Sequence, residues 1–457
     1  MKTPIADFCR EYSQQNKTRL HMPGHKGQGM LGVEALDLTE VKGADSLYEA
    51  YGIIAESEAN ASKLFGSRRT FYSTGGSSQS IKAMCLLACQ NWFKANDGTP
   101  LILAGRNAHK SFVQASQLIG FDVEWMVSEE EFSLCRCAIS PDGLQRQLER
   151  LNREDKAVAA VFVTSPDYLG NVLDIRGLAE TAHRYGTLLL VDNAHGAYLK
   201  FLPEDRHPMT LGADACADSA HKTLPVLTGG GYLHIGTNAP EGFEETAREA
   251  MCLFGSTSPS YLILQSLDLG NEWIEKNAQT AFSETAERVD AVKAQMESEG
   301  LVLMGDEPLK TTVDCVASNV GPGTAFADRL RDFDIECEYA DRDVVVLMFA
   351  PNNPKEDFEK LSAAVHALMP AQPGVPFTDN DWPPFSDRLP EKVLMPRDVL
   401  FRPTGTIPVA EAEGRIAADT SMGCPPAILP VVPGEKIDRS VVEILQYYGK
   451  QEITVLK

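Results

Sequence analysis

Between residues 69 and 235 the chain alternates short runs rich in β-branched and aromatic residues with longer amphipathic stretches. Helical spacing of apolar residues marks two of those stretches, 80–94 and 177–185. Because parallel strands have to be joined by crossovers, this alternation predicts an α/β fold with a doubly wound sheet. The seven candidate strands are 69–74, 101–105, 122–126, 158–164, 187–192, 213–219 and 231–235.

The chain changes character beyond about residue 240. Two long helices are predicted at 258–277 and 283–298, and residues 302–368 suggest a small α+β unit of strand, helix, strand, strand and helix. The proline-rich stretch 369–398 predicts an irregular connection, and 440–448 a closing helix. Because 457 residues are too many for a single compact hydrophobic core, we expect several domains or segments. These are an N-terminal segment with a large domain (1–240), connecting helices (241–300), a small domain (301–368) and a C-terminal domain (369–457).

Composition excludes some classes of function. A net charge of −22 argues against a nucleic-acid partner, whose phosphates would be repelled. No stretch of about 18 uninterrupted apolar residues suggests a membrane span, and the polar N-terminus lacks a signal-peptide core, so we expect a cytoplasmic protein. The closest cysteines, Cys135 and Cys137, have no matching second pair, so we expect reduced thiols and no structural metal.

A lysine follows the sixth candidate strand in the segment SAHKTL. Desolvation disfavours the charge of a lysine at the end of a buried strand, and a neutral amine can form a Schiff base with an aldehyde cofactor. The simpler interpretation of Lys222 is a side chain that reaches solvent from a strand end.

An aspartate, Asp192, ends the apolar fifth strand, at the edge where ligands bind in open α/β sheets. There it could pair with a protonated pyridine nitrogen. It could equally hold magnesium or cap the next helix. The spacing to Lys222 places both residues at ends of successive strands of one sheet.

Two further elements follow strands. The loop TGGSSQS from Thr74 combines glycines, hydroxyls and a helix start, which suits a phosphate, although such a loop is more often a turn and N-cap. In RNAHKS, His109 could stack on a flat ring, although a surface histidine is the commoner case. Each signal alone is weak. Their order, phosphate loop, histidine, aspartate and lysine, is typical of fold-type-I pyridoxal-phosphate enzymes.

At this point the chain resembles the ornithine/lysine/arginine decarboxylase family over most of its length. The blocks that carry the resemblance follow the family's order: LHMPGHKG from Leu20, DSLY from Asp45, GIIAE from Gly52, LFG from Leu64, RNAHKS from Arg106, TSPDYLGNVLDI from Thr164, DNAHGAYLKF from Asp192, SAHKTLPVLTGG from Ser219, GRIAA from Gly414 and PGE from Pro433. The chain looks like the short form, without the N-terminal wing domain. The resemblance implies a seven-stranded, mostly parallel sheet with helices on both faces, and a homodimer with active sites at its interface.

The resemblance also implies a role for each matching residue. Lys222 would form the Schiff base with pyridoxal 5'-phosphate, Asp192 would hold the pyridinium nitrogen, and His109 and Ala194 would pack on opposite faces of the ring. His195 would lie against the ring near its phenolic oxygen. The phosphate would be held by Gly76, Ser77, Ser78, Ser219 and His221, with Thr228 reaching the partner's phosphate. The reaction would remove the carboxylate of lysine, arginine or ornithine as carbon dioxide and give a polyamine-pathway amine.

The chain departs from the family where substrate choice would lie. Many relatives carry Asp-Glu-Ala, whereas Asn193 follows Asp192 here, and the usual YPPGIP reads CPPAILP from Cys424. Asp419 and Glu435 are candidates to meet a cationic substrate, although solvated acidic residues are the commoner case. The alternatives are another pyridoxal-phosphate lyase, an aminotransferase in which Arg402 grips the α-carboxylate, or a non-catalytic relative, against which the intact set of Lys222, Asp192 and His109 argues.

Overall fold

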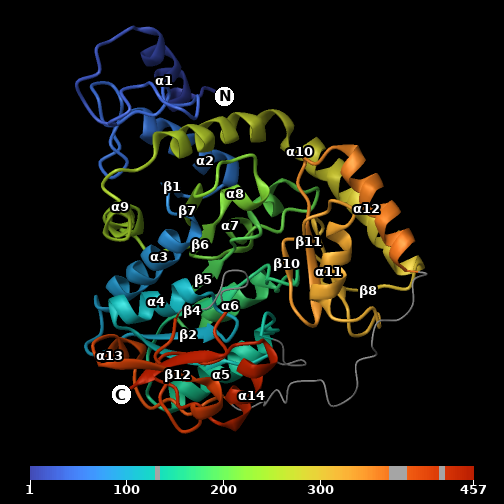
Figure 1. Ribbon diagram of the computed structural model, residues 1–457. Helices are drawn as coiled ribbons and strands as arrows, with labels where there is room; N and C mark the ends of the chain where they lie inside the picture. The colour runs from blue at the N-terminus through green and yellow to red at the C-terminus, as the bar shows by residue number, and fades with distance from the viewer. Residues whose placement is uncertain (129–133, 370–388, 421–427) are drawn as a thin grey trace. The chain divides into compact units, whose positions relative to one another are not determined.

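The computed structural model describes residues 1–128, 134–369, 389–420 and 428–457 (Figure 1). The chain forms two compact units. The first comprises Met1–Pro100, Leu148–Ser165 and Ile175–Thr280, and the second comprises Leu101–Gln147, Pro166–Asp174 and Ala281–Lys457. The predicted irregular connection falls mostly on residues 370–388, which lie outside the described ranges.

A seven-stranded sheet has the strand order β1-β7-β6-β5-β4-β2-β3. Pairs β2/β3, β4/β5 and β5/β6 are parallel, whereas β7 runs antiparallel to both of its neighbours, β6 and β1. This confirms the predicted α/β class with a mostly parallel sheet. The strands are β1 (Arg69–Ser73), β2 (Leu101–Gly105), β3 (Asp122–Met126), β4 (Val158–Thr164), β5 (Leu188–Asp192), β6 (Ala215–Asp218) and β7 (Gly231–Ile235).

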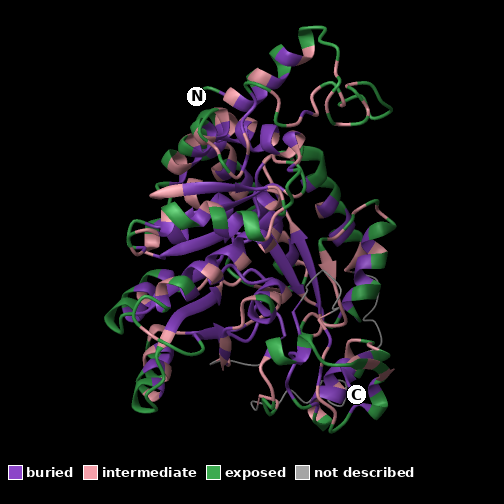
Figure 2. Ribbon diagram, turned by 90° about the vertical axis from the view of Figure 1, so that its left-hand side faces the viewer, coloured by how far each residue is buried: buried purple, intermediate pink, exposed green. Residues whose placement is uncertain are grey.

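Helices alternate with these strands, as the crossovers of a parallel sheet require. In the first unit, the buried face of α3 packs across β1 and β4 to β7, and Figure 2 shows that the strands in the interior are mostly buried. The helices up to residue 298 are α1 (Pro4–Gln14), α2 (Ile53–Phe65), α3 (Gly76–Trp92), α4 (Lys110–Ile119), α5 (Pro141–Arg153), α6 (Ile175–Arg184), η1 (Ala197–Phe201), α7 (Pro208–Leu211), α8 (Ala220–Thr223), α9 (Phe243–Leu253) and α10 (Tyr261–Ser298).

The N-terminal helix is fixed to the first unit by a buried carboxylate. Asp268 on α10 accepts hydrogen bonds from the main-chain N–H groups of Ile5 (2.9 Å) and Ala6 (3.0 Å), two donors in the first turn of α1 that have no partner within the helix. Its other oxygen accepts a hydrogen bond from the Ser57 hydroxyl on α2. Burial raises the pKa of Asp268 to about 6, while these donors oppose the shift.

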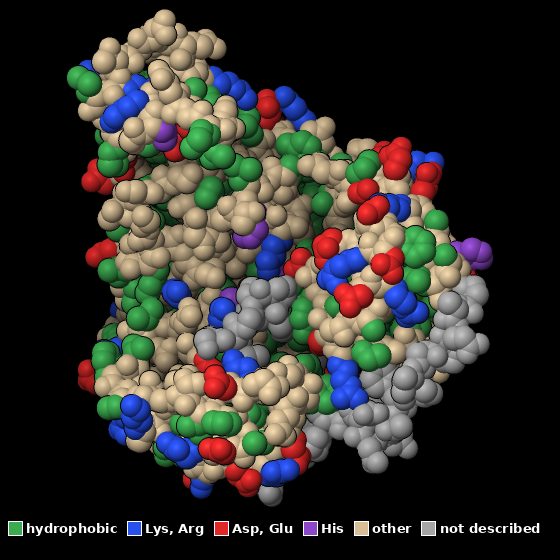
Figure 3. Space-filling model, viewed as in Figure 1, with side chains coloured by type: hydrophobic (Ala, Val, Ile, Leu, Met, Phe, Trp, Pro, Cys, Tyr) green, Lys and Arg blue, Asp and Glu red, His purple; other side chains and the backbone are tan. Residues whose placement is uncertain are grey.

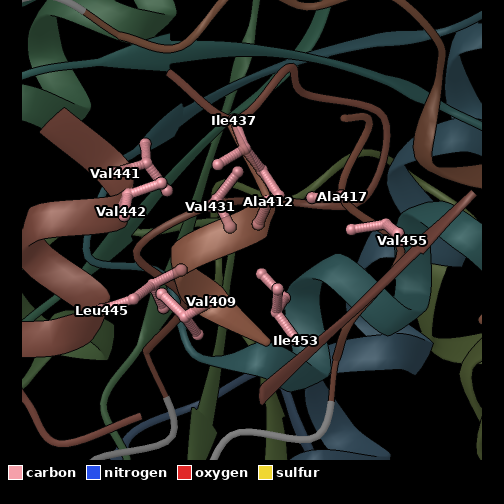
Figure 4. Close-up of a cluster of buried hydrophobic side chains, with 10 residues drawn as sticks. All are labelled: Val409, Ala412, Ala417, Val431, Ile437, Val441, Val442, Leu445, Ile453 and Val455. Carbon is pink, nitrogen blue, oxygen red and sulfur yellow. The ribbon is translucent and has the colours of Figure 1, made fainter. Parts of the chain in front are cut away.

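The second unit contains two small antiparallel sheets. A four-stranded sheet has the order β10-β11-β9-β8, and a two-stranded sheet pairs β12 with β13. Apolar side chains from η3, α14 and β13 form a separate core over the two-stranded sheet (Figure 4). The elements are β8 (Val302–Met304), β9 (Lys310–Asp314), α11 (Gly323–Arg331), β10 (Tyr339–Ala340), β11 (Val344–Met348), α12 (Lys355–Leu368), α13 (Pro396–Leu400), β12 (Thr404–Pro408), η3 (Val409–Glu411), α14 (Arg439–Tyr447) and β13 (Glu452–Leu456).

Two predicted details are wrong. The helices expected at 258–277 and 283–298 are one 38-residue helix, α10, because the stretch between them, AQTAF, contains good helix formers and neither glycine nor proline. The small unit has one more strand than expected, the three-residue β8, which pairs with β9 and is too short for a period-2 pattern to be recognised.

The surface carries both signs of charge. On the face that Figure 3 shows, acidic and basic side chains are interspersed, although acidic residues outnumber basic ones in the chain. None of the described helices combines the length and the apolar character needed to cross a bilayer. Most of the described cysteines are buried, and none of them is in a disulfide.

Gly231 provides a test of the packing in the first unit. A Cβ at this position would lie 2.8 Å from the Asp218 main-chain oxygen and 3.0 Å from the carbonyl carbon of Gly76. We predict that Gly231→Ala lowers the free energy of unfolding by about 2 kcal/mol, because the clash is with backbone that cannot move aside easily. Urea titration measures the change. Gly24→Ala is the control, because a Cβ there meets nothing within 4 Å. Equal stability of the two variants would contradict the close approach.

Candidate active site

Lys222 lies in the short helix α8, directly after β6. Its Nζ atom lies 2.9 Å from Nε2 of His195, a residue only 4% exposed. Lys222 itself is half-buried, so its amine is partly withdrawn from solvent. The structure thus brings together two of the predicted residues that are far apart in sequence.

Asp192 is the last residue of β5 and is only 2% exposed. It pairs in register with Thr164 on β4 and Ala217 on β6, so it lies between two neighbouring strands. Burial raises the pKa of Asp192 to about 6, and the Lys222 charge and the Ala194 N–H oppose that shift. The Ala194 N–H donates to Oδ1 of Asp192 at 3.2 Å. Asp192, Ala194, His195 and Lys222 therefore belong to one group.

The predicted phosphate loop lies at the N-terminus of α3. The helix begins at Gly76, and its N-cap residue, Gly75, offers no side chain to cap the first N–H groups. Ser219 donates a hydrogen bond from its hydroxyl to that of Ser77 at 2.9 Å, and the N–H of Gly76 donates to the Gly229 carbonyl at 2.8 Å. The segments at 76–78, 219–221 and 229–231 therefore meet in the first unit.

Two more predicted residues line this region. His221 Nδ1 donates to the Gly230 carbonyl at 2.8 Å, and a Cβ on Gly76 would come within 3.5 Å of the His221 ring. Ser78 follows Ser77 in the first turn of α3 and is half-buried. Thr228, in contrast, is exposed at the turn before β7, where its side chain is accessible to another molecule.

These residues suit a phosphorylated pyridine aldehyde. The start of a 17-residue helix without a side-chain cap can attract an anion, and the serine hydroxyls beside it can donate. A lysine amine lies close enough to a buried carboxylate to interact with it, which matches the aldehyde and the ring nitrogen of such a cofactor. The donor set fits pyridoxal phosphate better than magnesium, which prefers several oxygen ligands.

His109 belongs to the second unit. Its Nδ1 accepts a hydrogen bond from the Ser111 N–H at 3.1 Å, so the side chain caps α4. Its main chain forms an isolated bridge with Ile428. The predicted stacking of His109 on a cofactor ring remains a prediction.

The two acidic residues considered for substrate binding are buried and paired. Glu435 is 3% exposed and its Oε2 lies 3.1 Å from Nη2 of Arg106, while Asp419 pairs with Lys450 at 3.3 Å. The expectation that they are solvated is therefore wrong, because each forms an ion pair within the second unit. Arg402 is exposed after α13. Cys424 lies outside the described residues.

The sequence did not reveal a buried polar group behind the site. Asn193 donates through Nδ2 to Asp218 at 2.7 Å, and His207 and His234 lie against the same carboxylate. Polar residues in otherwise apolar strands, such as Asp218 at the end of β6 and His234 within β7, were the available signal.

Comparison with known proteins gives consistent results. The family described as Orn/Lys/Arg decarboxylase matches through its major domain at residues 3–316 and its C-terminal domain at residues 385–453. An arginine decarboxylase of Bacillus subtilis is 28% identical over 95% of this chain and 91% of its own length. An arginine decarboxylase of Bacillus cereus is 29% identical over 95% of this chain and 96% of its own length.

A solved structure shares the fold. The lysine decarboxylase of Francisella novicida superimposes with a TM-score of 0.80 at 19% identity, covering 100% of this chain and 81% of that chain. At this identity the likeness concerns the fold alone.

The Arg106–Glu435 pair generates a stability prediction. Arg106 also donates to the carbonyls of Leu429 (3.0 Å) and Pro430 (3.1 Å), so it holds the segment that leads to Glu435. We predict that Glu435→Gln lowers the free energy of unfolding by about 3 kcal/mol, because a buried guanidinium loses its counter-charge. Chemical denaturation measures the loss. Glu443→Gln, which removes a surface pair with Arg439, serves as control and should change it by about 0.5 kcal/mol or less. A small effect of Glu435→Gln would show that the pair is dispensable.

Proposed function

Because the chain belongs to the Orn/Lys/Arg decarboxylase family, a family of pyridoxal-phosphate-dependent enzymes, we propose that it removes the α-carboxylate of arginine as carbon dioxide. Decarboxylation of a basic amino acid is the activity of this family. Arginine is the narrower part of the proposal, and it is supported by the arginine decarboxylases that match this chain over nearly their whole length. Lysine and ornithine are the alternatives.

The observation that carries the proposal is the group formed by Lys222, His195 and Asp192. We propose that the Lys222 amine binds the aldehyde of the cofactor. His195 would hold or release a proton at Nζ, since its Nε2 lies 2.9 Å away. When bound, pyridoxal phosphate supplies the electron sink that stabilises the charge left at the α-carbon.

Asp192 would keep a proton on the ring nitrogen. A carboxylate at the end of a buried strand interacts strongly with a nearby cation because water is largely absent. Ala194, directly after the loop's Asn193, would pack on one face of the ring, and His109 would stack on the other.

The phosphate would be held by the start of α3. In this proposal Gly76 allows close approach of the backbone, and Ser77, Ser78, Ser219 and His221 donate hydrogen bonds. The 2.9 Å bond between Ser77 and Ser219 supports this, because it brings together a hydroxyl from the first turn of α3 and one from the residue that follows β6.

Assembly, location and domain limits extend the proposal. We propose a homodimer in which the exposed Thr228 reaches the partner's phosphate, and a cytoplasmic location. The four-part division at residues 240, 300 and 368 is proposed as the domain structure. A different lyase or an aminotransferase is the second candidate for the reaction, supported by Asn193 in place of the glutamate that many relatives carry.

The decisive experiment combines spectroscopy with carbon dioxide release. With pyridoxal phosphate added, we predict a visible absorption band from the lysine-bound cofactor and gas release that is faster with arginine than with lysine or ornithine. Lys222→Ala should abolish both, because no other amine can replace the covalent bond. Lys63→Ala, at an exposed lysine of the same unit, should leave both unchanged.

The outcomes separate the alternatives. If carbon dioxide is released only from lysine or only from ornithine, that amino acid is the substrate in place of arginine. A band that shifts with amino acid but without gas would support the second candidate, and keto-acid product would identify an aminotransferase. Absence of a band would contradict the proposal entirely.

Asp192→Asn tests the role of the carboxylate. The amide has nearly the same shape but cannot carry the negative charge that keeps the ring nitrogen protonated. We predict a fall in kcat of about 100-fold or more, with the visible band retained because Lys222 is intact. Asp97→Asn, at an exposed aspartate, is the control. Unchanged kcat in Asp192→Asn would remove Asp192 from the proposed mechanism.

A further inference from the structure

A buried carboxylate lies behind the proposed cofactor site. Oδ2 of Asp218 accepts hydrogen bonds from Nε2 of His207 at 3.0 Å and from Nε2 of His234 at 3.2 Å. Oδ1 accepts from Nδ2 of Asn193 at 2.7 Å and from the thiol of Cys216 at 3.7 Å. All five residues are fully buried, so water does not supply any of these donors.

The protonation of this group follows from its neighbours. Nδ1 of His207 accepts a hydrogen bond from the Met209 N–H at 3.3 Å, so the ring proton is on Nε2 and is donated to Asp218. Burial lowers the pKa of His234, which favours its neutral form. Burial by itself would raise the pKa of Asp218, but His207 and His234 hold it well below its usual range. Asp218 is therefore ionised and surrounded by donors.

The same geometry argues against a metal ion. His207, Cys216, Asp218 and His234 offer ligand atoms that lie within 4.8 Å of one another. A metal would need a lone pair on Nε2 of His207, and that atom carries the proton donated to Asp218. The four residues are therefore better described as a hydrogen-bonded network around a carboxylate.

Asn193 connects this network to the site. Its amide donates to Asp218, its main-chain N–H donates to the Ala217 carbonyl at 3.0 Å, and its main-chain oxygen accepts from the Gly196 N–H at 2.8 Å. The residue before it is Asp192, and His195 follows two residues later. Three hydrogen bonds thus fix the turn that carries both side chains.

We infer that Asn193 is a positioning residue for the cofactor site, and that the ionised Asp218, supported by His207 and His234, holds it in place. The inference rests on the proposed function and extends it to residues that do not touch the cofactor. It also explains the asparagine itself. A carboxylate at position 193 would face the Asp218 carboxylate at hydrogen-bond distance, whereas an amide donates to it.

Asn193→Asp gives a test with a pH signature. Two buried carboxyl groups in contact share one proton at low pH and repel each other once the second group ionises, so the pKa of one of them is raised. The measured quantity is the factor by which the dissociation constant for pyridoxal phosphate rises between about pH 6 and about pH 8. We predict that this factor is at least about tenfold larger in the variant than in the unmodified protein. Loss of the visible band measures the dissociation constant.

The double variant Asn193→Asp/Asp218→Asn is the matched control. It exchanges the two groups, so that the amide introduced at 218 donates to the carboxylate introduced at 193. We expect it to restore both the affinity and its pH dependence to within about threefold of the unmodified protein, a recovery that a general packing defect would not show. The other titratable groups around the pair are Asp192 on β5, Cys216 on β6, Tyr232 and His234 on β7, and His207, and they are the same in all three proteins.

Melting temperatures of the cofactor-free proteins across the same pH range provide a second readout. A single variant that binds cofactor like the unmodified protein at both pH values would overturn the inference. A double variant that binds cofactor as weakly as the single variant would also overturn the inference. The same holds for a stoichiometric metal ion in the purified protein. If the unmodified protein itself shows no visible band with pyridoxal phosphate, the proposed function fails and the inference with it. If the unmodified protein shows a normal band and the variants bind cofactor as it does, the inference fails but the proposed function stands.

Discussion

Two carboxylates, Asp192 and Asp218, end adjacent strands of one sheet and are both buried. Removing a carboxylate from water is costly, so each must be supplied with donors or an opposite charge. Asp218 has four donors and Asp192 has the Ala194 N–H and the nearby Lys222 charge. Among the contacts described above, Asp192 thus has fewer hydrogen-bond donors than Asp218. The pKa of Asp192 is raised, whereas the pKa of Asp218 is lowered. The first unit thus has one carboxylate that is satisfied by the protein and one that is poised to interact with a cation.

The second unit uses a buried charge differently. The Arg106 guanidinium joins a loop that follows β2 to carbonyls of residues 429 and 430 and to Glu435. A planar group with five donors can bind several acceptors at once, and a lysine could not make the same set of contacts. The arginine thereby ties two segments of the chain that are more than 300 residues apart in sequence. The block RNAHKS therefore contains a structural residue, Arg106, as well as the candidate ring-stacking residue His109.

The sequence predicts the sheet well because most strands are short runs of apolar, β-branched or aromatic residues between turns. The limits of β2, β3, β4 and β7 agree with the predicted ranges; Asp192 ends its strand and Lys222 follows its strand, as expected. Helix α3 begins at Gly76, four residues before the predicted start, because Gly76, Ser77 and Ser78 are residue types typical of a loop. The ion pair of Glu435 and the contacts of Asp218 could not be predicted, because their partners are distant in sequence and no local pattern links them.

The position of β7 has a consequence for the order in which the chain folds. β1 lies at the edge of the sheet and pairs with β7, which lies between β1 and β6. During synthesis the segment Arg69–Ser73 therefore leaves the ribosome long before its partner, Gly231–Ile235. At about 5–20 residues per second this delay is on the order of ten seconds. For that time the backbone groups of β1 have no sheet to join, which makes this segment the part of the first unit most exposed to incorrect strand pairing in the nascent chain.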